Sequence, residues 1–113
     1  MAKSNKPIFW SLFAAGGTLA AFLAPVLTLL LLLTALDHAP TVFGYAQMHA
    51  FASHWWAKLA LFGTLTLFLW HAAHRLRVTL HDLGLHQDAW IAPLLYLGAA
   101  AGTGWSALTL WRL

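Results

Sequence analysis

Four histidines and two arginines gather where one apolar segment ends. Residues 68–86 read FLWHAAHRLRVTLHDLGLH. On a helix of 3.6 residues per turn, His71, His74 and Arg75 lie on one face. Imidazole exchanges protons near neutral pH, and arginine donates hydrogen bonds while keeping its charge. The segment therefore combines groups that could bind, orient and protonate a polar ligand at the edge of an apolar layer.

The composition indicates that this apolar layer is a lipid bilayer. Of 113 residues, 61% are hydrophobic and 8% are charged, whereas soluble domains average about 25% charged residues. A soluble chain of this size could not bury so much apolar surface. The absence of cysteine excludes disulfides, thiolate metal sites and iron–sulfur clusters held by the chain itself. The six basic residues are too few for a nucleic-acid-binding face, so we expect contact with membrane lipid and not with nucleic acid.

Three long apolar runs predict an all-α membrane protein with three transmembrane helices, because a spanning helix needs about 20 residues. The expected spans cover residues 8–36, 58–83 and 89–111, and Gly84 is a candidate C-cap after the second. Residues 38–56 are aromatic and contain no lysine or arginine, which predicts an interfacial connection with a short helix. The GAAAG segment at Gly98–Gly102 is a small-xxx-small pattern that allows helices to approach closely.

The distribution of basic residues predicts the orientation in the membrane. Four lie on the side of the N-terminus and two on the other side: Lys3, Lys6, Arg75 and Arg77 against Lys58 and Arg112. Since cytoplasmic loops carry the excess of lysine and arginine, we expect a cytoplasmic N-terminus and a C-terminus outside. The histidine-rich end of the second span then lies at the cytoplasmic surface, where Arg75 and Arg77 are expected to extend to the headgroups.

Haem and quinone are the two ligands that such a site suggests. A bis-histidine haem needs imidazoles from two helices, but the first and third spans contain no histidine and the remaining ones lie at the opposite surface: His38, His49 and His54. This chain alone is therefore not expected to hold haem, and a haem shared with another subunit stays open. A quinone needs hydrogen-bond donors and a flat wall, which His74, Arg75 and the indole of Trp10 could supply.

The chain also resembles a known family through several segments taken together. PIFWSLFAAGG opens the first span, LW-x-x-x-HR ends the second, and HDL with a further histidine follows. Their order and spacing are similar to those of the D subunit of bacterial fumarate reductase over nearly the whole chain. The resemblance implies one membrane-anchor domain over residues 1–113, with no catalytic centre of its own.

The same resemblance implies partners and a binding site. The family's complex has a flavoprotein with FAD, an iron–sulfur subunit, and two hydrophobic anchors, the C and D subunits, in the bacterial cytoplasmic membrane. The anchors complete a menaquinol site that supplies electrons to fumarate in anaerobic respiration, and no haem is expected. By position in the motifs, Trp10 and Phe13 match the aromatic wall of this site, and His74 and Arg75 match its histidine and arginine. The resemblance assigns no role to the other histidines of the segment: His71, His81 and His86.

Three other functions stay open. A structural anchor without quinone contact predicts that substitutions of Trp10, His74 or Arg75 change assembly only. A haem-bearing anchor of a succinate dehydrogenase predicts a b-type optical spectrum. A small channel or transporter requires a polar pore lining, which the uncharged first and third spans do not provide.

Overall fold

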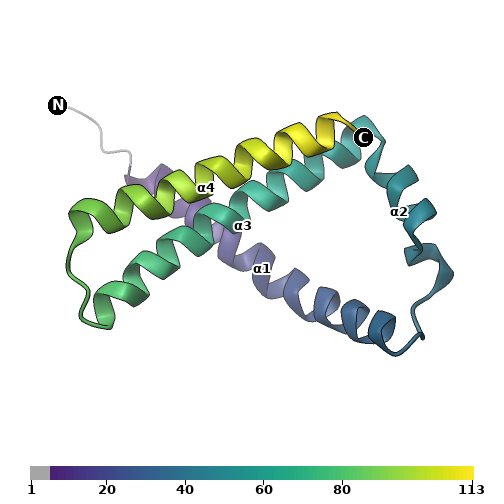
Figure 1. The fold of residues 1–113 in the computed structure, drawn as a ribbon, viewed down its shortest axis with the longest axis horizontal. Coiled ribbons are helices and arrows are strands. Elements are labelled where there is room, and N and C mark those ends of the chain that lie inside the picture. The colour runs from purple at the N-terminus through teal and green to yellow at the C-terminus, as the bar shows by residue number, and fades with distance from the viewer. Residues whose placement is uncertain (1–5) are drawn as a thin grey trace.

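A computed structural model of the chain describes residues 6–113, which form four α-helices and one short 3-10 helix (Figure 1). The elements are, in order, α1 (Lys6–Ala35), η1 (Thr41–Phe43), α2 (Tyr45–Ala52), α3 (Trp55–Asp82) and α4 (Asp88–Trp111). The predicted all-α class is confirmed, and the long helices begin and end close to the predicted bounds. Lys3, one of the basic residues behind the predicted orientation, lies outside the described residues.

Most of the apolar surface of the described residues faces outward. Four apolar side chains among these residues are buried, and three of the four are alanines: Ala57, Ala73, Ile91 and Ala99. By contrast, Leu31 in α1 is 72% exposed. Helices α1 and α4 are long and apolar enough to cross a membrane. Helix α3 is also long, but the histidines and arginines of its carboxyl half lower its hydropathy, so three membrane spans remain a prediction.

Helices α3 and α4 run antiparallel, side by side along their length (Figure 1). The face of α4 that is turned from the surface repeats every three or four residues, as expected for one helix packed on another: Ile91, Leu95, Ala99, Gly102 and Ser106. A Cβ built on Gly102 would lie 3.0 Å from Leu69 Cδ1, whereas one on Gly98 would meet no described atom within 4 Å. Close approach through GAAAG therefore holds at Gly102 and not at Gly98.

Helix α1 crosses α3 in its amino-terminal half and then diverges from it, so that η1 and α2 bridge back to the start of α3 (Figure 1). Gly16 lies at the crossing and is buried. A Cβ built on Gly16 would lie 2.7 Å from the carbonyl oxygen of Leu67, and one on Gly17 would lie 2.7 Å from Cε1 of His71. Two glycines thus allow the backbone of α1 to touch α3.

At the carboxyl ends of α1 and α3, main-chain N–H groups beyond the helix pair with carbonyls of its last turns. After α3, Gly84 has φ 96°, its N–H donates to the carbonyl of His81, and the N–H of Leu85 donates to that of Leu80. This is a Schellman motif, and it confirms the predicted glycine cap. Asp37 takes the same left-handed position after α1, with φ 56°. Such pairing is what a low-dielectric surrounding demands of a helix end.

We expect Gly16→Ala to weaken the crossing of α1 and α3. The added methyl group would collide with the main chain at Leu67, and a backbone cannot move aside as a flexible side chain can. The expected loss is about 1–3 kcal/mol of folding free energy, measured as a lower midpoint for thermal loss of the monodisperse complex in mild detergent. Gly63→Ala is the matched control, because its Cβ would meet no described atom within 4 Å. Equal midpoints for the two variants would contradict the close contact.

Candidate functional site

Aromatic side chains of α1 pack against the two histidines of α3 just beyond the glycine crossing. The ring of Phe13 stacks on that of His71, with centroids 4.3 Å apart and planes at 19°. It also meets His74 edge to face at 4.7 Å. Trp10 lies one turn earlier on α1, with its ring centroid 5.7 Å from Phe13 and 6.5 Å from His74. Three of the four predicted site residues, Trp10, Phe13 and His74, therefore lie together.

His71 connects α3 to α1 through a hydrogen bond. Its Nδ1 lies 3.0 Å from the carbonyl oxygen of Phe13. Because a carbonyl only accepts, Nδ1 carries the hydrogen and donates it. The imidazole of His71 therefore contacts Phe13 twice, by stacking on its ring and by a hydrogen bond to its carbonyl. The sequence assigned no role to His71, and the structure gives it one in the packing of α1 on α3.

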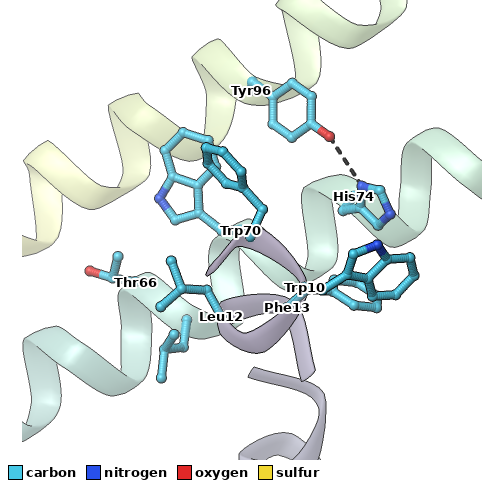
Figure 2. Close-up of a pocket in the computed structure, with 9 residues that line it drawn as sticks. Trp10, Leu12, Phe13, Thr66, Trp70, His74 and Tyr96 are labelled. Carbon is cyan, nitrogen blue, oxygen red and sulfur yellow. Dashed lines mark hydrogen bonds between the residues drawn. The ribbon is translucent and has the colours of Figure 1, made fainter. Parts of the chain in front are cut away.

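A cavity of about 730 Å³ opens beside this cluster, where α1, α3 and α4 meet (Figure 2). This volume lies within the range of small-molecule sites. Its wall is mostly aromatic and aliphatic, and it consists of Phe9, Trp10, Leu12, Phe13, Thr66, Leu67, Trp70, His74 and Tyr96. Polar groups are few, as is typical of sites in which a small number of donors orient an apolar ligand. The hydroxyl of Thr66 is buried and has no hydrogen-bond partner among the described residues.

Tyr96 closes the polar end of the cavity from α4. Its hydroxyl lies 3.2 Å from Nδ1 of His74 (Figure 2). Its ring stacks on Trp70, with centroids 5.9 Å apart and planes at 20°. Neither Tyr96 nor Trp70 was predicted as a site residue. The sequence feature that could have identified Tyr96 is a single tyrosine inside an apolar span. A phenol hydroxyl in such surroundings usually has a hydrogen-bond partner.

The two arginines of α3 have different surroundings. Arg77 forms a bidentate ion pair with Asp88, in which Nε donates to Oδ1 at 2.8 Å and Nη2 donates to Oδ2. Its Nη1 donates to the hydroxyl of Tyr96 at 3.4 Å. Arg77 therefore has a polar partner within the chain, and its expected extension to the headgroups stays a prediction. Arg75 is exposed and has no hydrogen bond or ion pair with residues 6–113, and it does not line the cavity.

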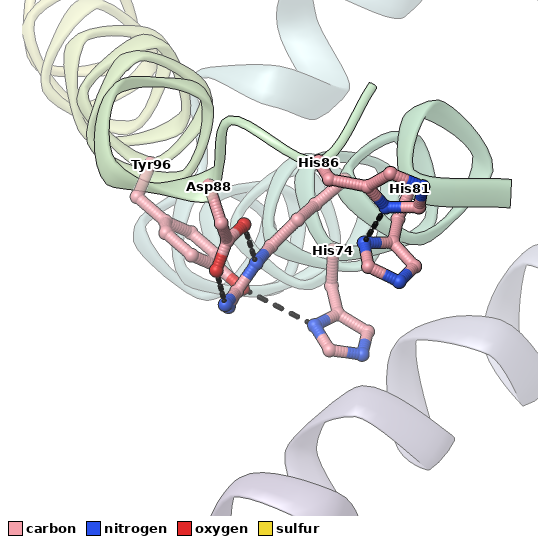
Figure 3. A network of polar contacts seen from close by, with 6 residues as sticks. His74, His81, His86, Asp88 and Tyr96 are labelled. Carbon is pink, nitrogen blue, oxygen red and sulfur yellow. Dashed lines mark hydrogen bonds and ion pairs between the residues drawn. The ribbon is translucent and has the colours of Figure 1, made fainter. Parts of the chain in front are cut away.

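The remaining histidines lie away from the cavity. His81 and His86 face each other across the α3–α4 turn, with their Nδ1 atoms 3.2 Å apart (Figure 3). At the other end of α3, His54 stacks on Trp56, and His49 in α2 lies beside Tyr45. Within residues 6–113, no three histidine or acidic side chains lie close enough together to hold a metal ion.

Apolar helices that turn their large side chains outward, two of them long enough to cross a bilayer, are typical of a small integral membrane protein. The family model that describes the D subunit of fumarate reductase matches residues 1–111. The chain therefore belongs to the family of fumarate reductase D subunits.

Individual relatives agree with this family. The fumarate reductase D subunit of Shewanella sp. (strain W3-18-1) is 38% identical over 103 residues, which cover 89% of this chain and 85% of that protein. The same protein of Vibrio parahaemolyticus serotype O3:K6 is 41% identical over 86 residues, covering 74% of this chain and 69% of that protein. That of Aliivibrio fischeri (strain MJ11) is 33% identical over 113 residues, covering 98% and 94%.

The hydrogen bond from His71 to the carbonyl of Phe13 can be tested by two substitutions. His71→Leu removes the donor to the carbonyl of Phe13, whereas His71→Asn keeps an amide N–H near the place of Nδ1. Both lose the ring stack, and we expect the leucine variant to be less stable by about 0.5–1.5 kcal/mol, the net value of one hydrogen bond. The thermal midpoint of the detergent-purified complex measures this difference. A leucine variant as stable as the asparagine variant would contradict a role for the hydrogen bond.

Proposed function

We propose that this chain is a membrane-anchor subunit of a quinol:fumarate reductase complex and contributes one wall of its menaquinol site. The observation that carries the proposal is the cluster of Trp10, Phe13 and His74 on a ligand-sized cavity. These residues come from two helices far apart in the sequence. Membership of the family of fumarate reductase D subunits supports the complex to which the site would belong.

In this proposal α1, α3 and α4 all cross the bacterial inner membrane, with the N-terminus in the cytoplasm and the C-terminus in the periplasm. Their lengths and the antiparallel packing of α3 on α4 support three spans. The excess of basic residues near the N-terminus and the α3–α4 turn supports the orientation. The cavity would then lie near the cytoplasmic surface, where the iron–sulfur subunit and the flavoprotein would dock on this chain and on the second hydrophobic anchor, the C subunit.

The chemistry assigns this chain a binding role without a catalytic centre. Oxidation of menaquinol to menaquinone releases two electrons and two protons. The electrons would pass through the iron–sulfur subunit to FAD in the flavoprotein, where fumarate takes up two electrons and two protons and becomes succinate. Trp10 and Phe13 would provide a flat apolar wall for the quinol ring. His74 would form a hydrogen bond with one oxygen of the ring.

Arg75 would act from outside the cavity. It is exposed and has no polar partner among residues 6–113, so its guanidinium is available to a neighbouring protein of the complex or to a ligand at the shared interface. No haem is proposed, because α1 and α4 contain no histidine to pair with one on α3.

The complex can be tested by purification through a tag on this chain in mild detergent. We expect flavin and iron–sulfur absorption, quinol–fumarate activity, and no haem bands in the optical spectrum. Recovery of the chain alone and without colour from intact membranes would contradict the proposed complex. A b-type spectrum would favour the haem-bearing anchor.

The site can be tested by Trp10→Leu, which removes the indole but keeps an apolar side chain. We expect kcat/KM for a menaquinol analogue to fall roughly three- to tenfold, the value of about 0.5–1.5 kcal/mol for an aromatic contact. Fumarate reduction with an artificial electron donor should not change, since it bypasses the quinol. Trp105→Leu is the matched control, because Trp105 is 72% exposed on α4 and does not line the cavity. Unchanged quinol oxidation per assembled complex would favour a structural anchor only, and an equal fall in both assays would leave the quinone role unsupported.

A further inference from the structure

A chain of polar contacts runs from the start of α4 to the histidine of the cavity (Figure 3). Asp88 holds Arg77 through two hydrogen bonds. Arg77 donates to the Tyr96 hydroxyl at 3.4 Å, and its Cζ lies 5.8 Å from the centroid of the Tyr96 ring. The Tyr96 hydroxyl lies 3.2 Å from Nδ1 of His74. Asp88, Arg77 and Tyr96 lie outside the set of residues that the proposed function assigns to the quinol.

The donors and acceptors of these groups favour one direction for the contacts. A guanidinium has only donors, so the oxygen of Tyr96 accepts from Arg77. The O–H of Tyr96 is left to donate, and we assign its hydrogen bond to Nδ1 of His74, the acceptor that lies within its reach among the described residues. When Nδ1 accepts, the neutral imidazole carries its hydrogen on Nε2.

The second ring nitrogen of His74 faces away from Tyr96, on the side where Trp10 lies (Figure 2). His74 is half-buried and meets Trp10 and Phe13 edge to face, so its ring plane is restrained from α1 as well. The position of Tyr96 is in turn held by its stack on Trp70. Contacts from α1, α3 and α4 thus restrain the ring of His74, which lines the cavity.

We propose that Tyr96 is a positioning residue that keeps the hydrogen of His74 on Nε2, so that His74 donates a hydrogen bond to an oxygen of the bound quinone or quinol. This inference rests on the proposed quinol site. A donor of this kind strengthens its hydrogen bond as negative charge grows on the oxygen that loses its proton. Without the hydroxyl of Tyr96, the hydrogen of a neutral His74 divides between the two nitrogens, and the donor is lost in part of the molecules.

The first experiment compares Tyr96→Phe with the wild-type complex. The substitution removes the hydroxyl and keeps the ring that stacks on Trp70. We expect KM for a menaquinol analogue to rise about twofold, because the donor is lost in about half of the molecules, while fumarate reduction with an artificial donor is unchanged. Tyr45→Phe is the matched control, since Tyr45 is 84% exposed on α2 and does not line the cavity. An unchanged KM in Tyr96→Phe would overturn the inference.

A second set of variants separates positioning from a structural effect. In a His74→Ala background, Tyr96→Phe should cause no further rise in KM, because no imidazole remains to be oriented. An equal rise in both backgrounds would overturn the inference. His74→Gln keeps an amide N–H near the place of Nε2, so it should retain part of the affinity for the quinol analogue whether or not Tyr96 has its hydroxyl. His74→Asn places its amide near Nδ1 instead and should not retain that affinity. If His74→Ala and Trp10→Leu both left quinol oxidation unchanged, the proposed site itself would fail, and the role of Tyr96 with it.

Discussion

The contact of the α1 backbone with α3 at Gly16 is the constraint on which the site depends. A Cβ at Gly16 would lie 2.7 Å from the main chain at Leu67, so the backbones of the two helices are in close contact there. The turn before Gly16 on α1 lies opposite the turn after Leu67 on α3, and the next pair of turns follows in the same way. Phe13 therefore faces His71, and Trp10 faces His74. The aromatic wall is a consequence of where the glycine crossing places α1 on α3 (Figure 1).

The stability of this arrangement cannot come from a core of its own. The described residues bury few side chains, and large apolar ones such as Phe22 and Leu31 face outward. Lipid and neighbouring proteins must cover this surface, so close packing and hydrogen bonds between helices carry the specificity of the fold. This explains why the crossing uses glycine, and why the polar side chains of the site satisfy one another: His71 with a carbonyl of α1, and Arg77 with Asp88.

Much of the fold could be predicted from sequence, because long apolar runs and a cap at Gly84 determine where helices begin and end. Trp10 and His74 were proposed together from the chemistry that a quinone needs, and Phe13 was added by the family resemblance. Their contacts could not follow from periodicity, since they depend on which helices pack together. Tyr96 and Asp88 were missed for the same reason: both act across the α3–α4 interface. Gly98 shows the converse error, because a small-xxx-small pattern does not say which of its glycines faces the neighbouring helix.

The separation between Arg75 and Arg77 follows from helix geometry. Two residues apart on a helix means roughly 200° of rotation, so the two side chains leave α3 in nearly opposite directions. Arg77 points to α4, where Asp88 and Tyr96 hold it. Arg75 must then point away from α4, toward the side that this chain leaves uncovered. Arg77 thus links α3 to the start of α4 through a partly exposed ion pair, and Arg75 is left for the surroundings of the chain. An exchange of their environments would require α3 to turn about its axis and would separate its histidines from Trp10 and Phe13.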